Sequence, residues 1–391
     1  MISITIATRS YMPKVRILYK TFKKYNPTIN FICISLDHIS DEEFPVVYWK
    51  DIVKKYIPDI NEWSFKYNII ELSTAIKPIC LKYFLNKNNT VFYLDPDLEF
   101  FNTLPLNEFD GDINLTLHRG VPEDPDNGVN DVILNNCGIF NLGFICIKNT
   151  PNSNKFLDWW FDKLYNYCYN CRVRNLFTDQ KWCDFIPYYF KNVNILAPHI
   201  SGLNISSWNL SCFDSLIRDE NGDILFYANN KTIPLIFYHW SGTTPSINNT
   251  HKWCIKKYSK DSLKRKGLTL LLEMHQNYID NLNTEELNIC NDSLKQYSDG
   301  STILDSERRL YTELSKDASV KRDIGNPYKY FNQWLYKNYG PVKSAAALNI
   351  KFDSDLYAMN YPDAIEYAGL DRDKLLFHYI TIGYKLGYKI S

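Results

Sequence analysis

Two carboxylates that directly follow an apolar segment are the side chains in this sequence best suited to chemistry. Residues 90–94 are largely hydrophobic and lead straight into Asp95, Pro96 and Asp97. In extended backbone, residues two positions apart face the same side, so the two carboxylates would lie together. Each makes the other more costly to ionise unless a cation sits between them, and a hard divalent ion meets that need. The pattern fits a metal site, although an ordinary acidic turn after a strand has the same appearance.

A histidine ends another apolar segment, which covers residues 232–239. His239 is followed by Trp240, Ser241 and Gly242, and a turn at this glycine would let backbone approach a phosphate. Taken alone, a histidine here is more often a hydrogen-bonded core residue. Combined with the two aspartates, it completes a mixed oxygen and nitrogen ligand set, which suits Mn²⁺ somewhat better than Mg²⁺.

The elements that must position these side chains alternate between two periodicities. Strand patterns cover residues 2–7, 30–36, 90–95, 113–117, 139–148, 193–196 and 232–239. Helical patterns cover residues 13–25, 73–86, 154–167 and 178–190. Apolar strands separated by helices are typical of a parallel α/β sheet, which binds ligands at the carboxyl ends of its strands. Residue 95 stands at such an end.

The character of the sequence changes after about residue 255. A long helix is predicted over 259–278, partial helix over 284–317, and short helical pieces over 326–391. We therefore expect an α/β domain over 1–255, a helical extension over 256–320 and a small helical module over 321–391.

Composition and charge exclude several classes of protein. The 391 residues carry 44 basic and 44 acidic side chains, and a general nucleic-acid binder would show a basic excess. We find no signal peptide and no apolar run long enough to cross a bilayer, so we expect a cytoplasmic protein. The 10 cysteines are scattered apart from Cys168 and Cys171, a weak zinc signal, which favours reduced thiols.

The order of six motifs resembles that of the metal-dependent GT-A glycosyltransferases, especially those like glycosyltransferase family 8. Aromatic and amide motifs around Trp160 and Trp208 look like those of bacterial surface-glycan transferases. The resemblance covers roughly the first two-thirds of the chain. The six motifs are Thr5–Thr8, Ala75–Pro78, Val91–Asp97, Phe140–Phe144, Thr178–Trp182 and His239–Gly242.

The resemblance implies a GT-A (Rossmann-like) nucleotide-sugar-binding domain over 1–255, with a mainly helical C-terminal extension. The residues implied to hold Mn²⁺, or Mg²⁺, are Asp95, Asp97 and His239. The residues implied to bind the donor are Ala7, Thr8, Arg9, Lys77, Asp95 and Gly242. The residues implied to act beside the transferred sugar are Asp179 and Gln180. Family 8 usually places a phosphate-binding lysine shortly after the histidine, whereas Thr243, Thr244 and Pro245 stand here.

The activity implied is transfer of a sugar, with retention, from a UDP-sugar to a glycan, a glycoprotein or a lipid-linked acceptor. An inverting reaction would need a base, and Asp179 would be the candidate because the Gln180 amide is not basic. A nucleotidyltransferase is the alternative enzyme, but residues 8–11 lack the Gly-rich basic loop common in that class. A non-catalytic carbohydrate-binding protein is a further alternative, against which the intact ligand set argues.

Other segments keep two interpretations. Trp159 and Trp160 fit a helix core better than a sugar platform. Asn204, Trp208 and Asn209 suit sugar hydroxyls and structural roles equally. His118, Arg119 and the loop over 120–130 could contact substrate, the loop as a lid, or lie in solvent. The lysine-rich segment 256–266 reads as a solvated helix face, with peripheral contact to anionic lipid as the alternative.

Overall fold

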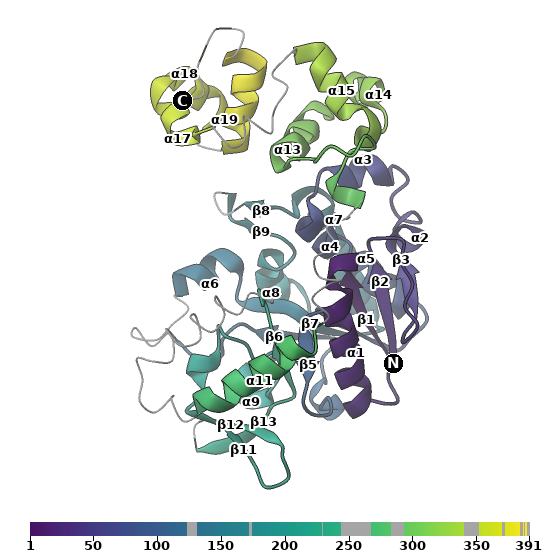
Figure 1. The fold of residues 1–391 in the computed structure, drawn as a ribbon, viewed down its shortest axis with the longest axis vertical. Helices are drawn as coiled ribbons and strands as arrows, with labels where there is room; N and C mark the ends of the chain where they lie inside the picture. The colour runs from purple at the N-terminus through teal and green to yellow at the C-terminus, as the bar shows by residue number, and fades with distance from the viewer. Residues whose placement is uncertain are drawn as a thin grey trace. The chain divides into compact units, whose positions relative to one another are not determined.

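A computed structural model describes most of the chain (Figure 1). The described residues are 1–122, 131–171, 174–228, 230–243, 267–282, 293–339, 352–369, 372–383, 386 and 388. The chain divides into two compact units, the first made of residues 1–56 and 73–290 and the second of 57–72 and 291–391. The predicted boundaries near 255 and 320 stay predictions, and the second unit includes a segment, 57–72, that the sequence patterns do not separate.

The first unit is built on a seven-stranded sheet of order β10-β6-β7-β4-β1-β2-β3 (Figure 1). Its strands are β1 (Ile2–Ala7), β2 (Asn30–Ser35), β3 (Val46–Tyr48), β4 (Thr90–Leu94), β6 (Ile113–Leu117), β7 (Phe140–Lys148) and β10 (Val193–Leu196). β1 runs parallel to both β2 and β4, so the predicted α/β sheet is confirmed. A wholly parallel sheet is wrong, because β7 runs antiparallel to β4 and β6. β7 is buried at all but its last residue, so its apolar sequence reveals burial and not direction.

Helices flank the strands in the first unit. They are α1 (Met12–Tyr25), α2 (Trp49–Val53), α5 (Lys77–Leu85), α6 (Asp131–Cys137), α7 (Pro151–Tyr167), α8 (Ile186–Tyr189), α9 (Pro198–Ser201) and α11 (Leu268–Asp280). On α1, which matches the predicted helix over 13–25, Val15, Leu18 and Phe22 form an apolar face and are each 0% exposed. On α7, Trp160 is 0% exposed and donates its indole N–H to the Asp179 carbonyl oxygen, which confirms a core role.

Some predicted helices have different bounds. The segment 73–86 is two helices, α4 (Ile69–Ala75) and α5, and Pro78 lies in the first turn of α5, where proline is favoured. The segment 178–190 is a 3₁₀-helix (Lys181–Phe185) followed by α8. The structure describes the predicted helix 259–278 only from residue 267 onward. The lysine-rich segment 256–266 and residues 123–130 of the predicted lid lie outside the described residues.

The predicted strand 232–239 is two strands in two different sheets. β13 (Lys231–Pro234) joins a three-stranded sheet with β11 (Ser215–Arg218) and β12 (Ile224–Ala228). β14 (Phe237–His239) instead pairs antiparallel with β5 (Leu98–Phe100), which places His239 opposite Leu98. β13 ends at Pro234, which has no amide proton to donate to a ladder. Because Leu98 directly follows Asp97, the pairing of β14 with β5 brings His239 close to the two aspartates.

The second unit is helical, as predicted for the C-terminal region. Its helices are α3 (Ile60–Phe65), α13 (Asp305–Leu314), α14 (Ala318–Ile324), α15 (Pro327–Tyr339), α17 (Ser354–Asn360), α18 (Pro362–Ala368) and α19 (Arg372–His378). Phe65 is fully buried among aromatic rings, including those of Tyr311, Tyr328 and Phe331. Segment 57–72 therefore supplies part of the core of this unit.

Candidate active site

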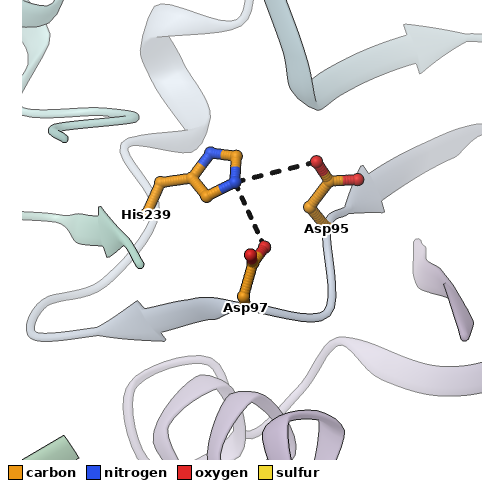
Figure 2. A group of neighbouring side chains, drawn as sticks. All are labelled: Asp95, Asp97 and His239. Carbon is orange, nitrogen blue, oxygen red and sulfur yellow. Dashed lines mark ion pairs between the residues drawn. The ribbon is translucent and has the colours of Figure 1, made fainter. Parts of the chain in front are cut away.

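The structure brings the three predicted metal ligands together. One ligand atom from each of Asp95, Asp97 and His239 lies within 4.8 Å of the others. Figure 2 shows the imidazole facing both carboxylates, with Nε2 3.1 Å from Asp97 Oδ1 and 3.8 Å from Asp95 Oδ2. The arrangement has a simple origin: β4 ends at Leu94, β5 begins at Leu98, and β14 pairs with β5.

The electrostatics of this cluster favour a bound cation. Burial raises the pKa of Asp97, but the charge and hydrogen bond of His239 and the charge of Lys14 outweigh it and hold the value at about 2. Asp95 accepts a hydrogen bond of 2.7 Å from the Tyr93 hydroxyl. Two carboxylates and one imidazole nitrogen fit the donor preferences of Mn²⁺ and Mg²⁺. In the described part of the chain, this is the one group of acidic, histidine or cysteine side chains that could hold a metal ion.

A glycine in β7 makes room for the histidine. A Cβ atom on Gly143 would lie 2.5 Å from His239 Cε1 and 2.8 Å from Asn141 Oδ1. The Gly143 carbonyl oxygen also accepts a hydrogen bond from the Asp95 amide, at 2.8 Å. The glycine in the predicted motif Phe140–Phe144 is therefore needed for close packing against the site.

Lys77 and Asp179 form a buried ion pair beside the cluster. Lys77 Nζ lies 2.9 Å from Asp179 Oδ2 and 3.7 Å from Asp95 Oδ1, and it donates to the Leu142 carbonyl oxygen at 3.1 Å. Burial disfavours the charge on Lys77, but the two carboxylates more than offset it, so its pKa is raised. Lys77 thus holds the Asp95 and Asp179 carboxylates in place, and its predicted contact with the donor stays a prediction.

Asp179 follows a strained backbone position. Thr178 has φ +46°, a left-handed conformation that is rare for a β-branched residue and that recurs at functional sites. Its hydroxyl donates to Asp179 Oδ1 at 3.1 Å, so both carboxylate oxygens of Asp179 have partners. Gln180 donates its amide to the Cys137 carbonyl oxygen at 2.8 Å. The predicted pair is brought near Lys77, with Asp179 only 3% exposed.

The predicted nucleotide-binding residues lie at the carboxyl end of β1. β1 runs beside β4 with Ile4 opposite Tyr93, so the segment that follows β1 reaches the same sheet edge as Asp95. Ala7 and Thr8 are buried, and the Arg9 amide donates to Asp37 Oδ2 at 2.8 Å. The remaining predicted donor residue, Gly242, follows β14 with φ +70°, and a Cβ atom on it would meet none of the described residues within 4 Å.

Sequence reasoning missed two residues that belong to this edge. Partial burial and the charges of Asp97 and Asp95 raise the pKa of Tyr11 to about 12. Lys14, in the first turn of α1, is 5% exposed, and its Nζ lies 4.7 Å from the centre of the Tyr11 ring. Within the described residues Lys14 makes no hydrogen bond or ion pair. The signal available was a lysine on the otherwise apolar face of an amphipathic helix that follows the first strand.

A network of buried amides backs the histidine. The Asn204 amide lies between the His239 ring and two other polar side chains, Asn141 and Thr116. Asn141 in turn contacts His118 Nε2 at 3.2 Å. The sequence left open whether Asn204 is structural or functional. Its buried amide contacts His239, a candidate metal ligand, so a structural role would also serve the site. His118 is 7% exposed and does not lie in solvent.

Comparison with known proteins gives relatives of uncharacterised function. No family model matches the chain. It is 32% identical to the uncharacterized protein YfnF of Bacillus subtilis (strain 168) over 185 residues. The aligned region covers 44% of this chain and 56% of YfnF. It is 22% identical over 254 residues to the uncharacterized protein YfnD of the same organism, covering 61% of this chain and 77% of YfnD. The chain thus spans little more than half the length of YfnF.

Solved structures to which the chain is similar include several glycosyltransferases. The galactosyltransferase LgtC, in complex with donor and acceptor sugar analogs, is 14% identical with a TM-score of 0.41, covering 73% of this chain and 97% of LgtC. Mouse xyloside xylosyltransferase 1 is 12% identical with a TM-score of 0.36, covering 61% of this chain and 97% of the mouse protein chain. GlyE of Streptococcus pneumoniae TIGR4 is 13% identical with a TM-score of 0.30, covering 51% and 45%. These are enzymes of the class that the motifs resemble.

Among the described residues, no helix is both long enough and apolar enough to cross a membrane.

Proposed function

We propose that this chain is a metal-dependent glycosyltransferase that takes a sugar from a nucleotide-diphosphate donor, with UDP as the nucleotide. The observation that carries the proposal is the meeting of Asp95, Asp97 and His239 at the carboxyl end of β4, beside the end of β1. Ligands of parallel sheets bind at this edge. The acceptor would be a glycan, a glycoprotein or a lipid-linked sugar, and the protein would act in the cytoplasm.

The three ligands would hold Mn²⁺, with Mg²⁺ as the alternative, and the ion would offset the negative charge that the departing diphosphate gains. A positive side chain near the phosphates would add to that effect. Lys77 is engaged by Asp179 and Asp95, whereas Lys14 has no such partner among the described residues. We therefore include Lys14 in the proposed diphosphate site, in the role that family 8 usually gives to a lysine shortly after the histidine.

The contacts of the Asp179 carboxylate fit a reaction with retention of configuration. Its two carboxylate oxygens already accept from Thr178 and pair with Lys77, and the side chain is 4% exposed. A general base must reach the proton that it removes, and this carboxylate is held away from that task. Asp179 would then orient a sugar hydroxyl or the lysine. The Gln180 carbonyl oxygen would lie near the positive charge that develops on the sugar.

A panel of nucleotide sugars, screened for slow hydrolysis with and without Mn²⁺, tests the proposal and identifies the donor without an acceptor. Calorimetry of UDP binding gives a second readout. Asp97→Asn should weaken UDP only when Mn²⁺ is present, whereas the exposed Asp51→Asn should change nothing. Equal weakening in EDTA would show that Asp97 is structural. Hydrolysis of no donor, together with UDP binding that ignores Mn²⁺, would refute the proposed function.

The role of Lys14 is tested by nucleotide affinity in the absence of metal. Because its charge would act directly on phosphate, Lys14→Met should weaken UDP about tenfold in EDTA as well, and leave the affinity for uridine unchanged. Lys20→Met, on an exposed part of the same helix, is the matched control. A loss that is equal for UDP and uridine would exclude a phosphate contact.

A further inference from the structure

A buried chain of hydrogen bonds connects the Gly138 carbonyl oxygen to the ring of His239, and each donor and acceptor in it can be assigned. We infer that Asn204, held by Asn141, is a positioning residue that keeps a proton on His239 Nδ1. Nε2 is then the ring nitrogen that faces Asp95 and Asp97 and is left to bind the metal ion. This inference rests on the proposed metal site and deepens it.

The orientation of Asn141 follows from the backbone. The Gly143 amide can only donate, and it lies 3.0 Å from one terminal atom of the Asn141 side chain, which must be the oxygen. The nitrogen of that amide therefore faces His118 Nε2, which has to accept. At the far end of the ring, the Gly138 carbonyl oxygen can only accept, and it lies 3.0 Å from His118 Nδ1. The two backbone groups agree on one state, a neutral His118 protonated on Nδ1.

The orientation of Asn204 follows from that of Asn141. Asn141 Oδ1 lies 2.9 Å from a terminal atom of Asn204, which must be the donor Nδ2. The second proton of this amide is directed at Thr116 Oγ1, 2.8 Å away. The other terminal atom of Asn204 is thus Oδ1, and it lies 3.1 Å from His239 Nδ1. An amide oxygen can only accept, so His239 Nδ1 must carry a proton.

The surroundings leave this arrangement little freedom. Asn204 is 0% exposed, and its backbone has φ +55°, which asparagine tolerates better than most residues. Its carbonyl oxygen accepts from the Asn209 side chain at 3.0 Å, and the His239 carbonyl oxygen accepts from the Ser206 hydroxyl at 2.7 Å. Histidines that bind metals usually donate their other ring N–H to a partner that fixes the ring, and loss of that partner weakens metal binding about 10- to 100-fold.

The test measures Mn²⁺ affinity by electron paramagnetic resonance. Asn204→Gly removes the amide and still accommodates the left-handed backbone, and it should weaken Mn²⁺ about 10- to 100-fold. Thr116→Val removes the other partner of the same amide without touching His239, and it should stay within about threefold of the parent protein. A merely structural role would weaken both variants alike, and that result, or parental affinity in Asn204→Gly, would overturn the inference.

Tautomers give a readout that needs no Mn²⁺. In protein labelled with ¹⁵N at histidine, Nδ1 of His239 should carry a proton both without metal and with diamagnetic Mg²⁺. An unprotonated Nδ1 would overturn the inference, whatever the metal affinities are. Failure of the parent protein to bind Mn²⁺ would refute the proposed metal site, and the tautomer would still decide the role of Asn204.

Discussion

Replacing Lys77 by methionine should destabilise the first unit strongly, because the lysine neutralises two carboxylates in a nearly dry environment. Lys77 is 3% exposed, and its Nζ lies 2.9 Å from Asp179 and 3.7 Å from Asp95. Removing one partner of a buried ion pair costs about 3–5 kcal/mol, since the remaining charge stays buried. The unpaired Asp179 would also take up a proton more readily, so the loss in the variant should grow as the pH rises.

Urea unfolding of metal-free protein, followed by circular dichroism at pH 7, measures this cost. Asp179→Asn should cost less than Lys77→Met, because Lys77 keeps Asp95. The double variant should cost about 0.5–3 kcal/mol less than the sum of the two single variants, the range found for residues in direct contact. Lys54→Met is the control, since this lysine pairs with Asp51 at the same 2.9 Å but both side chains are more than half exposed. The control should lose under about 1 kcal/mol.

A result in which Lys77→Met and Lys54→Met lose equal stability would refute this reasoning. Strict additivity of Lys77→Met and Asp179→Asn would also refute it. In either case Lys77 would be available to the donor, as the motif resemblance implies, and its ion pairs would not hold the site together.

Three further predictions concern other positions. Burial lowers the pKa of His118 from 6.5 to about 4. The free energy of unfolding should therefore fall by at most about 3 kcal/mol as the pH drops from 6.5 toward 4. In urea titrations His118→Gln should reduce this pH dependence. Gly143→Ala should push the His239 ring away, weaken Mn²⁺ at least about tenfold and cost about 1–3 kcal/mol. Arg309→Met takes the positive charge from the fully buried Glu71 and should cost about 3 kcal/mol by urea unfolding.

Gly143→Ala and Arg309→Met each have a matched control. Gly222→Ala, where a Cβ meets nothing within 4 Å, should leave Mn²⁺ affinity unchanged. Lys316→Met breaks a pair with Glu313 in which the lysine is 68% exposed, and it should cost under about 1 kcal/mol. A pH slope that persists in His118→Gln, or an Arg309→Met variant as stable as Lys316→Met, would contradict the corresponding prediction.

Much of the first unit could be predicted from local patterns. Apolar alternation places β1 at the start of the chain, and the run before Asp95 is a buried strand that ends where the carboxylates begin. Asp95 and Asp97 lie together as predicted, but in the turn between β4 and β5 and not in extended backbone. The helical spacing of aromatic residues put Trp160 in the core. These features succeed because periodicity records which side of an element is buried, and that is a local property of the sequence.

Partners distant in sequence could not be predicted in this way. The strand direction of β7, the break between β13 and β14 and the membership of residues 57–72 in the second unit all depend on which elements pair. An apolar segment has the same pattern beside any partner, so the choice among partners is decided by the packing of the whole unit.

The site shows the same division. The types of Asp95, Asp97 and His239, and their places at strand ends, are written in the sequence and already point to a cation. The pairing of β14 with β5 decides that the histidine reaches the carboxylates, and the amides of Asn141 and Asn204 decide which ring nitrogen faces them. Hydrogen-bond direction is set by the neighbours that folding supplies, because an amide or an imidazole can donate or accept at either end until a backbone group fixes it.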